Sequence, residues 1–118
     1  MLELNLPHKE PIRFAKEIIS KELNRARVRI GFDKIPSLAM MIEAAAQSSA
    51  ATGEGDAKMG FLVSLKNVKL LTPPTKTILE VEVVNEHNMG NMKMMSFDIF
   101  EDETKVSTGS FMIAIESK

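Results

Sequence analysis

The stretch from Ser37 to Ala50 constrains this chain more than any other, because it is a nearly uninterrupted apolar helix pattern with a carboxylate near its middle. A helix that is apolar on almost every side needs more cover than one flat contact provides. Burying an ionised carboxylate without a partner is costly, so Glu43 must be paired, protonated or placed beside a cleft. Gln47 follows one turn later on the same helix face. Glu43 and Gln47 together form a polar notch that predicts a ligand site beside an apolar cavity.

The residues around this stretch predict where the helix begins and ends. Asp33 or Ser37 supplies a capping oxygen, and Pro36 is tolerated in the first helical turn. A loop with two glycines is expected from Thr52 to Lys58, so the helix should stop before it.

The segment before the helix predicts two strands, from Ile12 to Ile19 and from Arg25 to Phe32. In the second, apolar side chains at 28, 30 and 32 alternate with Arg27, Arg29 and Gly31, which indicates a half-buried strand. The alternative is a helix from Ile12 to Arg27, because Phe14, Ile18 and Ile19 also have helical spacing.

Four strands are predicted after the loop: Phe61 to Leu71, Thr77 to Val84, Met92 to Phe100 and Val106 to Ile115. Short connections between such strands favour an antiparallel sheet. A chain of 118 residues and 13.1 kDa is the size of one domain, taken here as residues 1–118. The expected fold class is therefore α+β, with a curved antiparallel sheet wrapped around one long central helix.

Composition argues against several classes of function. A formal net charge of -1 with no Tyr or Trp offers no basic, aromatic surface for nucleic acid. The absence of Cys fits a cytoplasmic protein and removes thiolate chemistry. No signal peptide or membrane-inserting segment is expected, since the longest apolar run is interrupted at Glu43 and Gln47. Two separated His residues and scattered carboxylates do not form a metal-ligand set, so no metal site is expected.

Several segments resemble the 3-hydroxyacyl-(acyl carrier protein) dehydratases, which belong to the hotdog-fold superfamily together with acyl-CoA thioesterases. Leu6 to Ile12 is similar to the family's Leu-Pro-His-Arg-x-Pro-Phe motif, and Met41 to Gln47 is similar to its Leu-Leu-Glu-Ala-Met-Ala-Gln helix. Lys66 to Leu70, Thr72 to Pro74 and Leu79 to Val83 resemble a family strand, its Pro-containing turn and the next strand.

This resemblance implies a hotdog homodimer in which the acyl chain of a thioester runs beside the central helix at the subunit interface. Coenzyme A or the phosphopantetheine of acyl carrier protein would enter as part of the ligand, with no separate cofactor. Glu43 becomes the catalytic candidate, since hotdog thioesterases use a helix carboxylate as base or nucleophile. The substrate-binding candidates at the helix start are Pro36, Ser37 and Leu38, where free backbone N–H groups can face the thioester oxygen. Gln47 is the fourth candidate, because it shares the polar notch with Glu43.

The chain departs from the dehydratases at their catalytic histidine. That residue stands fourteen positions before the helix Glu, and here the position counted back from Glu43 is Arg29. Dehydration needs both a base and an acid, and one carboxylate does not easily hold both protonation states at once. We therefore expect a fatty-acyl thioester binding protein without dehydratase activity. The alternatives are a thioesterase or an atypical dehydratase that uses Glu43, and a purely structural dimer.

Two other groups of residues receive simpler interpretations. Arg25, Arg27 and Arg29 are expected to form the solvated face of a strand, with contact to coenzyme A phosphates as the alternative. Residues Met92, Met94 and Met95 are expected to fill the core or an interface.

Overall fold

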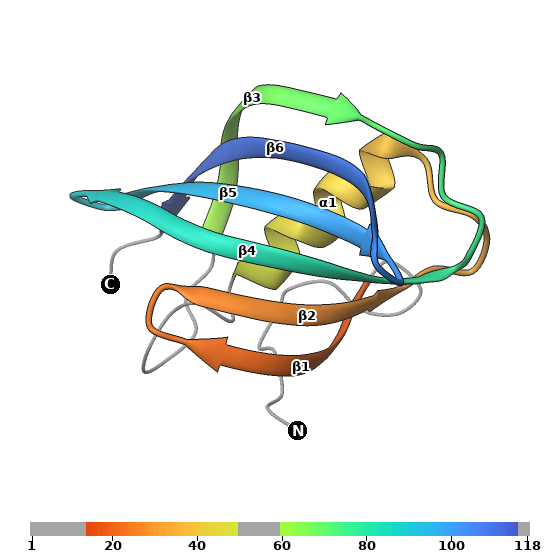
Figure 1. Cartoon of the computed structure of the whole chain (residues 1–118). Coiled ribbons are helices and arrows are strands. Elements are labelled where there is room, and N and C mark those ends of the chain that lie inside the picture. Colours follow the sequence, from red (N-terminus) through yellow and green to blue (C-terminus); the bar gives the residue numbers. More distant parts are fainter. Residues whose placement is uncertain (1–13, 50–59, 116–118) are drawn as a thin grey trace.

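The computed structural model describes residues 14–49 and 60–115, which form one six-stranded sheet and one helix (Figure 1). The elements are β1 (Ala15–Glu22), β2 (Arg25–Gly31), α1 (Leu38–Ser48), β3 (Gly60–Leu70), β4 (Ile78–Met89), β5 (Met92–Glu101) and β6 (Thr104–Ile115). Their order across the sheet is β1-β2-β4-β5-β6-β3, and every neighbouring pair is antiparallel. The predicted α+β fold is confirmed. The segment Leu6 to Ile12 and the loop Thr52 to Lys58 lie outside the described residues.

The early part of the chain is a hairpin, so the alternative helix from Ile12 to Arg27 is wrong. Strand β1 pairs with β2 from Ala15 opposite Ile30 to Glu22 opposite Arg25. Asn24 turns the chain with a φ of 65°, a left-handed conformation that Asn tolerates better than most residues. Strand pairing decides this segment, because Ala15 pairs with Ile30 far along the chain, whereas helical spacing considers near neighbours only.

Ser37 begins the helix, as one of the two predicted caps. Its hydroxyl oxygen accepts a hydrogen bond from the Met40 backbone N–H at 3.2 Å. Residues Met41, Ala44, Ala45 and Ser48 are buried against the concave side of the sheet. Ala39 is exposed and the flank around Glu43 is only half-buried, so the sheet covers one side of α1 and leaves part of the other side uncovered.

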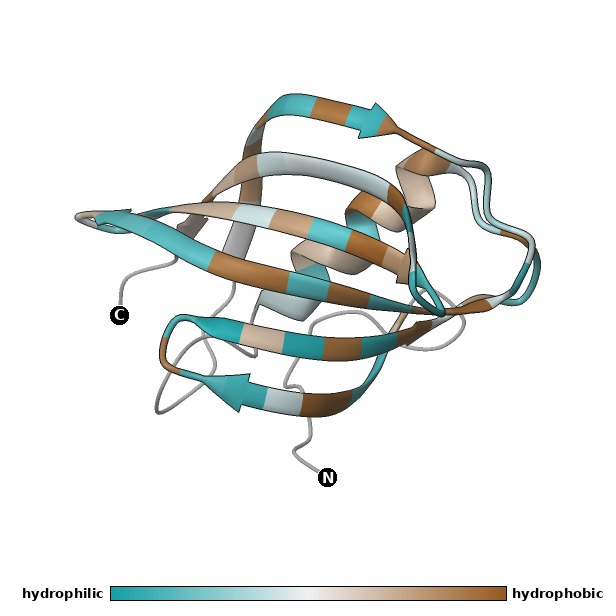
Figure 2. Ribbon diagram, viewed as in Figure 1, coloured by the Kyte–Doolittle hydropathy of each residue, from teal (hydrophilic) through white to brown (hydrophobic). Residues whose placement is uncertain are grey.

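The core lies between α1 and the concave face of the sheet. Along β2, β4, β5 and β6, buried and less buried residues alternate, as the teal and brown bands of β2 and β4 show in Figure 2. The largest buried side chains are Phe97, Phe111, Ile30, Met41, Leu79, Met95 and Ile99. The rings of Phe97 and Phe111 pack in a tilted arrangement with centroids 5.9 Å apart. Side chains of intermediate exposure between the buried ones therefore face the convex, outer surface.

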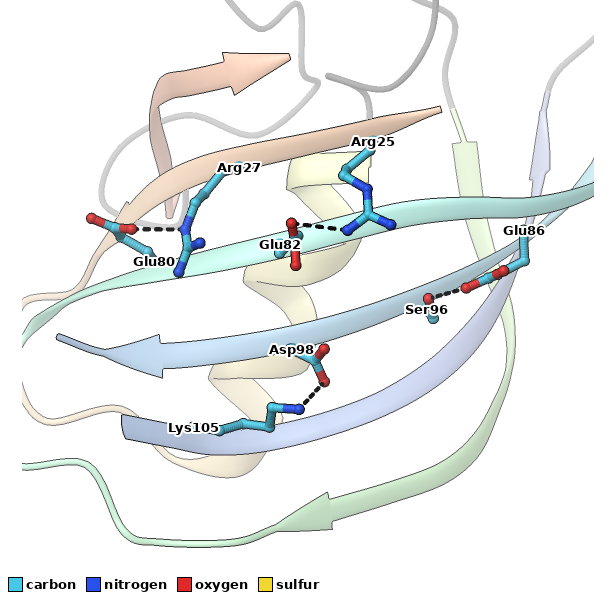
Figure 3. A network of polar contacts seen from close by, with 8 residues as sticks. All are labelled: Arg25, Arg27, Glu80, Glu82, Glu86, Ser96, Asp98 and Lys105. Atoms are coloured by element: carbon cyan, nitrogen blue, oxygen red, sulfur yellow. Dashed lines mark hydrogen bonds and ion pairs between the residues drawn. The ribbon is translucent and has the colours of Figure 1, made fainter. Parts of the chain in front are cut away.

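Ion pairs between neighbouring strands cover this outer surface (Figure 3). Arg25 pairs with Glu82 at 3.0 Å and Arg27 pairs with Glu80 at 2.9 Å. The Arg27 guanidinium also lies 4.7 Å from the centre of the Phe100 ring. These contacts confirm the prediction that the arginines form a solvated strand face. No helix among the described residues has the length and apolar character needed to cross a membrane.

Candidate functional site

Glu43 and Gln47 lie together on one flank of α1, as their spacing predicts. The Gln47 amide Nε2 donates a hydrogen bond to Glu43 Oε2 at 3.3 Å. Gln47 is 4% exposed, whereas Glu43 is half-buried. The carboxylate is therefore oriented by a buried amide on an otherwise apolar helix.

Gln47 also joins the helix to the first strand. Its Oε1 accepts backbone hydrogen bonds from Phe14 N at 2.7 Å and Ala15 N at 3.1 Å. These two contacts fix which way the amide points, because an oxygen that accepts from the backbone leaves the NH₂ group directed at Glu43. Gln47 thus positions the carboxylate, a role that the helix spacing alone does not reveal.

Replacing Gln47 with leucine is expected to lower the free energy of unfolding by about 1–3 kcal/mol, because the N–H groups of Phe14 and Ala15 lose their acceptor. Urea denaturation followed by circular dichroism measures this change. Ser48→Ala is the matched control, since the neighbouring Ser48 hydroxyl bonds only to Ala44 O within the same helix. Equal losses in the two variants would contradict the linking role of Gln47.

The other predicted binding residues lie at the start of the helix. Pro36 is buried, the Ser37 hydroxyl caps the helix, and Leu38 packs against the core. Glu43 follows Leu38 by five residues, which is about 7.5 Å along the helix axis and about 140° around it. The Leu38 side chain and the Glu43 carboxylate therefore do not share a helix face.

The residues that do share the Glu43 face were not predicted. Ala39, Met40 and Ala46 stand three or four positions from Glu43, so they flank it on the surface of α1. Ala39 is exposed, and Met40 and Ala46 are half-buried, with Ala46 packed against the edge of the core. The helical spacing that paired Glu43 with Gln47 identifies these residues as the apolar border of the notch.

Arg29, which stands fourteen positions before Glu43, faces away from this site. Arg29 lies on the outer surface of β2 between the buried residues Val28 and Ile30, and it pairs with Glu17 of β1. A side chain on the convex face cannot act together with Glu43 on the concave side. His87 is exposed on β4, and His8 lies outside the described residues.

Strand β3 forms one edge of the sheet and carries apolar side chains that the fold leaves exposed. Leu62 is paired with Ile113 and Leu65 with Phe111, so both face the concave side of the sheet. They are nevertheless 42% and 47% exposed, respectively. The apolar concave surface therefore continues past the part that α1 covers.

A separate hollow of about 250 Å³ lies at the ends of β2 and β4. Its lining residues are Lys16, Arg29, Ile30, Gly31, Phe32, Asp33, Thr77 and Ile78, and none of them belongs to α1.

Within residues 14–49 and 60–115, no three His, Cys, Asp or Glu side chains are grouped so that they could hold a metal ion. The groups that the Glu43 site offers to a ligand are thus one carboxylate, one amide and apolar side chains.

The chain is similar to known proteins in structure but matches none of them in sequence. No protein-family model matches the chain, and no curated protein sequence matches it. The dehydratase heterocomplex ApeI:P from Xenorhabdus doucetiae superposes with a TM-score of 0.78 at 17% identity, over 96% of this chain and 89% of that one.

Two further solved structures resemble the chain closely. The HP0420 homologue from Helicobacter felis has a TM-score of 0.74 at 20% identity and covers 96% of this chain and 97% of its own. A hypothetical thioesterase from Streptococcus pneumoniae, solved with coenzyme A, has a TM-score of 0.67 at 13% identity over 86% of each chain. At these identities the likeness concerns the fold, and with the sheet order and central helix described above it shows that this chain has the hotdog fold.

Proposed function

We propose that this protein is a homodimer that binds fatty-acyl thioesters, carried on coenzyme A or on acyl carrier protein. The observation that carries the proposal is the half-buried Glu43 carboxylate, held by Gln47 on the uncovered flank of an apolar helix. A carboxylate and an amide beside apolar side chains match a ligand with a polar thioester and a long hydrocarbon chain. The solved neighbours that are a dehydratase complex and a coenzyme A-bound thioesterase support this ligand class.

The two edges of the sheet argue for dimerisation through β3. Strand β1 at one edge carries charged side chains at 16, 17, 21 and 22, which protect an edge from pairing. Strand β3 carries exposed apolar residues, and Leu62, Val63 and Leu65 lie in its first half. A long apolar edge strand readily pairs with another strand. Pairing of β3 with β3 of a second copy would also cover the concave apolar surface beside α1 and enclose the acyl-binding space.

Wild-type protein is expected to sediment as a dimer at micromolar concentration, and Leu65→Lys is expected to sediment as a 13.1 kDa monomer. The added charge would be buried without a partner in the paired edge. Ile19→Lys is the matched control, because Ile19 is similarly exposed, at 40%, on the opposite edge strand β1. A monomeric wild type, or a Leu65→Lys variant that remains dimeric, would contradict dimerisation through β3.

Ligand binding is tested by thermal unfolding with acetyl-, octanoyl- and palmitoyl-coenzyme A, with free coenzyme A as the control. A bound acyl thioester at 100 times its Kd should stabilise the folded dimer by about 2.7 kcal/mol, which raises Tm. Free coenzyme A should give a smaller shift, because the apolar site binds the acyl chain. Absence of any shift with all three thioesters would refute the proposed ligand class.

A thioesterase is the second candidate, and the Glu43–Gln47 contact favours it. As a general base, the carboxylate would remove a proton from water, and the resulting hydroxide would attack the thioester carbonyl. Collapse of the intermediate would break the C–S bond, and Glu43 would return its proton to the departing thiolate, so that the fatty acid and the thiol are released. A dehydratase has less support, because Arg29 is the residue expected at the histidine position by counting back from Glu43, and it faces the other side of the sheet.

A further inference from the structure

The outer surface at one end of the sheet carries a cluster of methionines around a histidine. We call it the methionine patch, and its members are His87, Met89, Met92, Met94 and Met112. The patch lies where the β4–β5 hairpin extends beyond α1, at the left of Figure 1. It contains four of the nine methionines of the chain.

The sheet register brings these side chains together. His87 of β4 is paired with Met94 of β5, and Met94 is paired with Met112 of β6. Directly opposite residues project from the same face, with Cβ atoms about 4.5–5.5 Å apart. Met89 and Met92 are paired with each other in the adjacent row. Three neighbouring strands therefore direct one imidazole and four thioethers toward a common surface.

The core defines which surface this is. Met95 and Phe111 are buried on the concave side, at 0% and 2% exposure. Their chain neighbours Met94 and Met112 must then face the convex side, because successive side chains of a strand alternate between faces. Met95 fills the core as predicted, whereas Met94 lies on the opposite face of the sheet.

A bulge in β4 places the histidine on the same surface. Asn85 is paired with the buried Met95, yet His87 is paired with Met94, and the register shifts between them. In a regular strand, residues two apart share a face, so His87 would otherwise follow Asn85 to the concave side. Bulges redirect side chains in this way and recur beside functional sites.

The patch is accessible to a small ion. Met89 is 41% exposed, His87 is exposed, and the remaining three methionines are half-buried. The core methionines Met41 and Met95, by comparison, are fully buried. The four methionines of the patch, which form two adjacent rows across the strands, therefore do not fill the core.

The side chains of the patch have the chemistry of a soft cation site. Thioether sulfur is an uncharged, soft ligand that selects Cu(I), and imidazole is also a common ligand of copper. The carboxylate of Glu86 nearby accepts a hydrogen bond from Ser96 Oγ at 2.7 Å.

We propose that the methionine patch binds one soft monovalent metal ion, Cu(I) or its analogue Ag(I), through His87, Met94 and Met112 with one thioether of Met89 or Met92. This site revises the expectation of no metal, which considered histidine and carboxylate ligands alone. It is independent of the acyl-binding proposal, because the patch and Glu43 lie on opposite faces of the sheet.

Anaerobic titration of the full-length protein with Cu(I), in competition with a chromogenic Cu(I) chelator, tests the site. One ion should bind per protomer, and native mass spectrometry should show the same ratio with Ag(I). Nuclear magnetic resonance of the methionine methyl groups should show shifts at Met94 and Met112 on adding Ag(I), and none at Met95. Zn(II) in place of Ag(I) should leave these signals unchanged, because the usual protein ligands of Zn(II) are thiolate, imidazole and carboxylate groups and not thioethers.

The double variant Met94→Leu/Met112→Leu keeps side-chain volume and hydrophobicity, so it should fold. Changes to groups that only support a metal's ligands alter affinity about 10- to 100-fold, so removal of two ligands should weaken Cu(I) binding by about 100-fold or more. Met41→Leu/Met95→Leu is the matched control and should bind as the wild type does. Wild-type protein that does not compete for Cu(I), or a double variant with unchanged affinity, would overturn the proposal.

Discussion

Phe97→Ala is expected to lower the free energy of unfolding by about 3–5 kcal/mol, the usual cost of deleting a fully buried aromatic ring. Phe97 is 2% exposed and packs against Phe111 in the middle of the concave face. A Cβ placed on Gly109 would lie 3.0 Å from the Phe97 ring, so the ring packs directly against the backbone of that glycine. A large cavity is therefore expected.

Urea denaturation followed by far-ultraviolet circular dichroism measures this effect, because the chain has no Trp or Tyr for fluorescence. Phe100→Ala is the matched control, since the same deletion on the same strand removes a ring from the outer face. There the ring contacts Arg27, an interaction that contributes about 0.5–1 kcal/mol at exposed sites. If Phe97→Ala and Phe100→Ala lowered the free energy of unfolding by similar amounts at equal protein concentration, Phe97 would not be the core residue of this pair.

Glu43→Gln is expected to reduce hydrolysis of long-chain acyl-coenzyme A by about 100-fold or more if the protein is a thioesterase, the effect of losing a positioned base. The amide keeps the shape of the side chain, so ligand-induced stabilisation should survive. Hydrolysis rate and Tm with and without ligand, measured on both proteins, give the two results.

Glu80→Gln is the control for this experiment, because Glu80 lies on the outer surface in an ion pair with Arg27. Its hydrolysis rate should equal that of the wild type. Unchanged hydrolysis in Glu43→Gln would exclude Glu43 as the base. Wild-type protein that is stabilised by acyl-coenzyme A but hydrolyses none of it would favour the binding protein over the thioesterase.

The boundaries of the strands show where local patterns stop being informative. Strand β4 was predicted to end at Val84, because polar residues follow, but it continues to Met89. The strand continues because β5 pairs with it as far as Met92 opposite Met89, and a tight turn at Gly90 with a φ of 63° closes the hairpin. A strand that extends beyond the core is exposed on both faces and can carry polar residues throughout. Alternation of hydrophobic and polar residues therefore does not predict where such a strand ends.

Local patterns in the chain were enough to predict those helices, strands and side-chain pairs whose residues interact with near neighbours in the sequence. The apolar stretch after Ser37 requires a covered helix, the alternation along β2 and β4 requires a sheet with one wet face, and the spacing of Glu43 and Gln47 places them on one flank. These are consequences of helical and strand periodicity, which depend on a few consecutive residues.

Features that depend on which strands are neighbours follow from the complete fold and could not be predicted from local patterns. The fold placed β3 at an edge with its apolar residues uncovered, brought the backbone of Phe14 and Ala15 to Gln47, and turned His87 to the outer surface by one bulge. Each depends on contacts between residues far apart in the chain. Their register is set by the burial of the whole sheet against α1, and a single inserted residue reverses the face of a side chain without any trace in the local pattern.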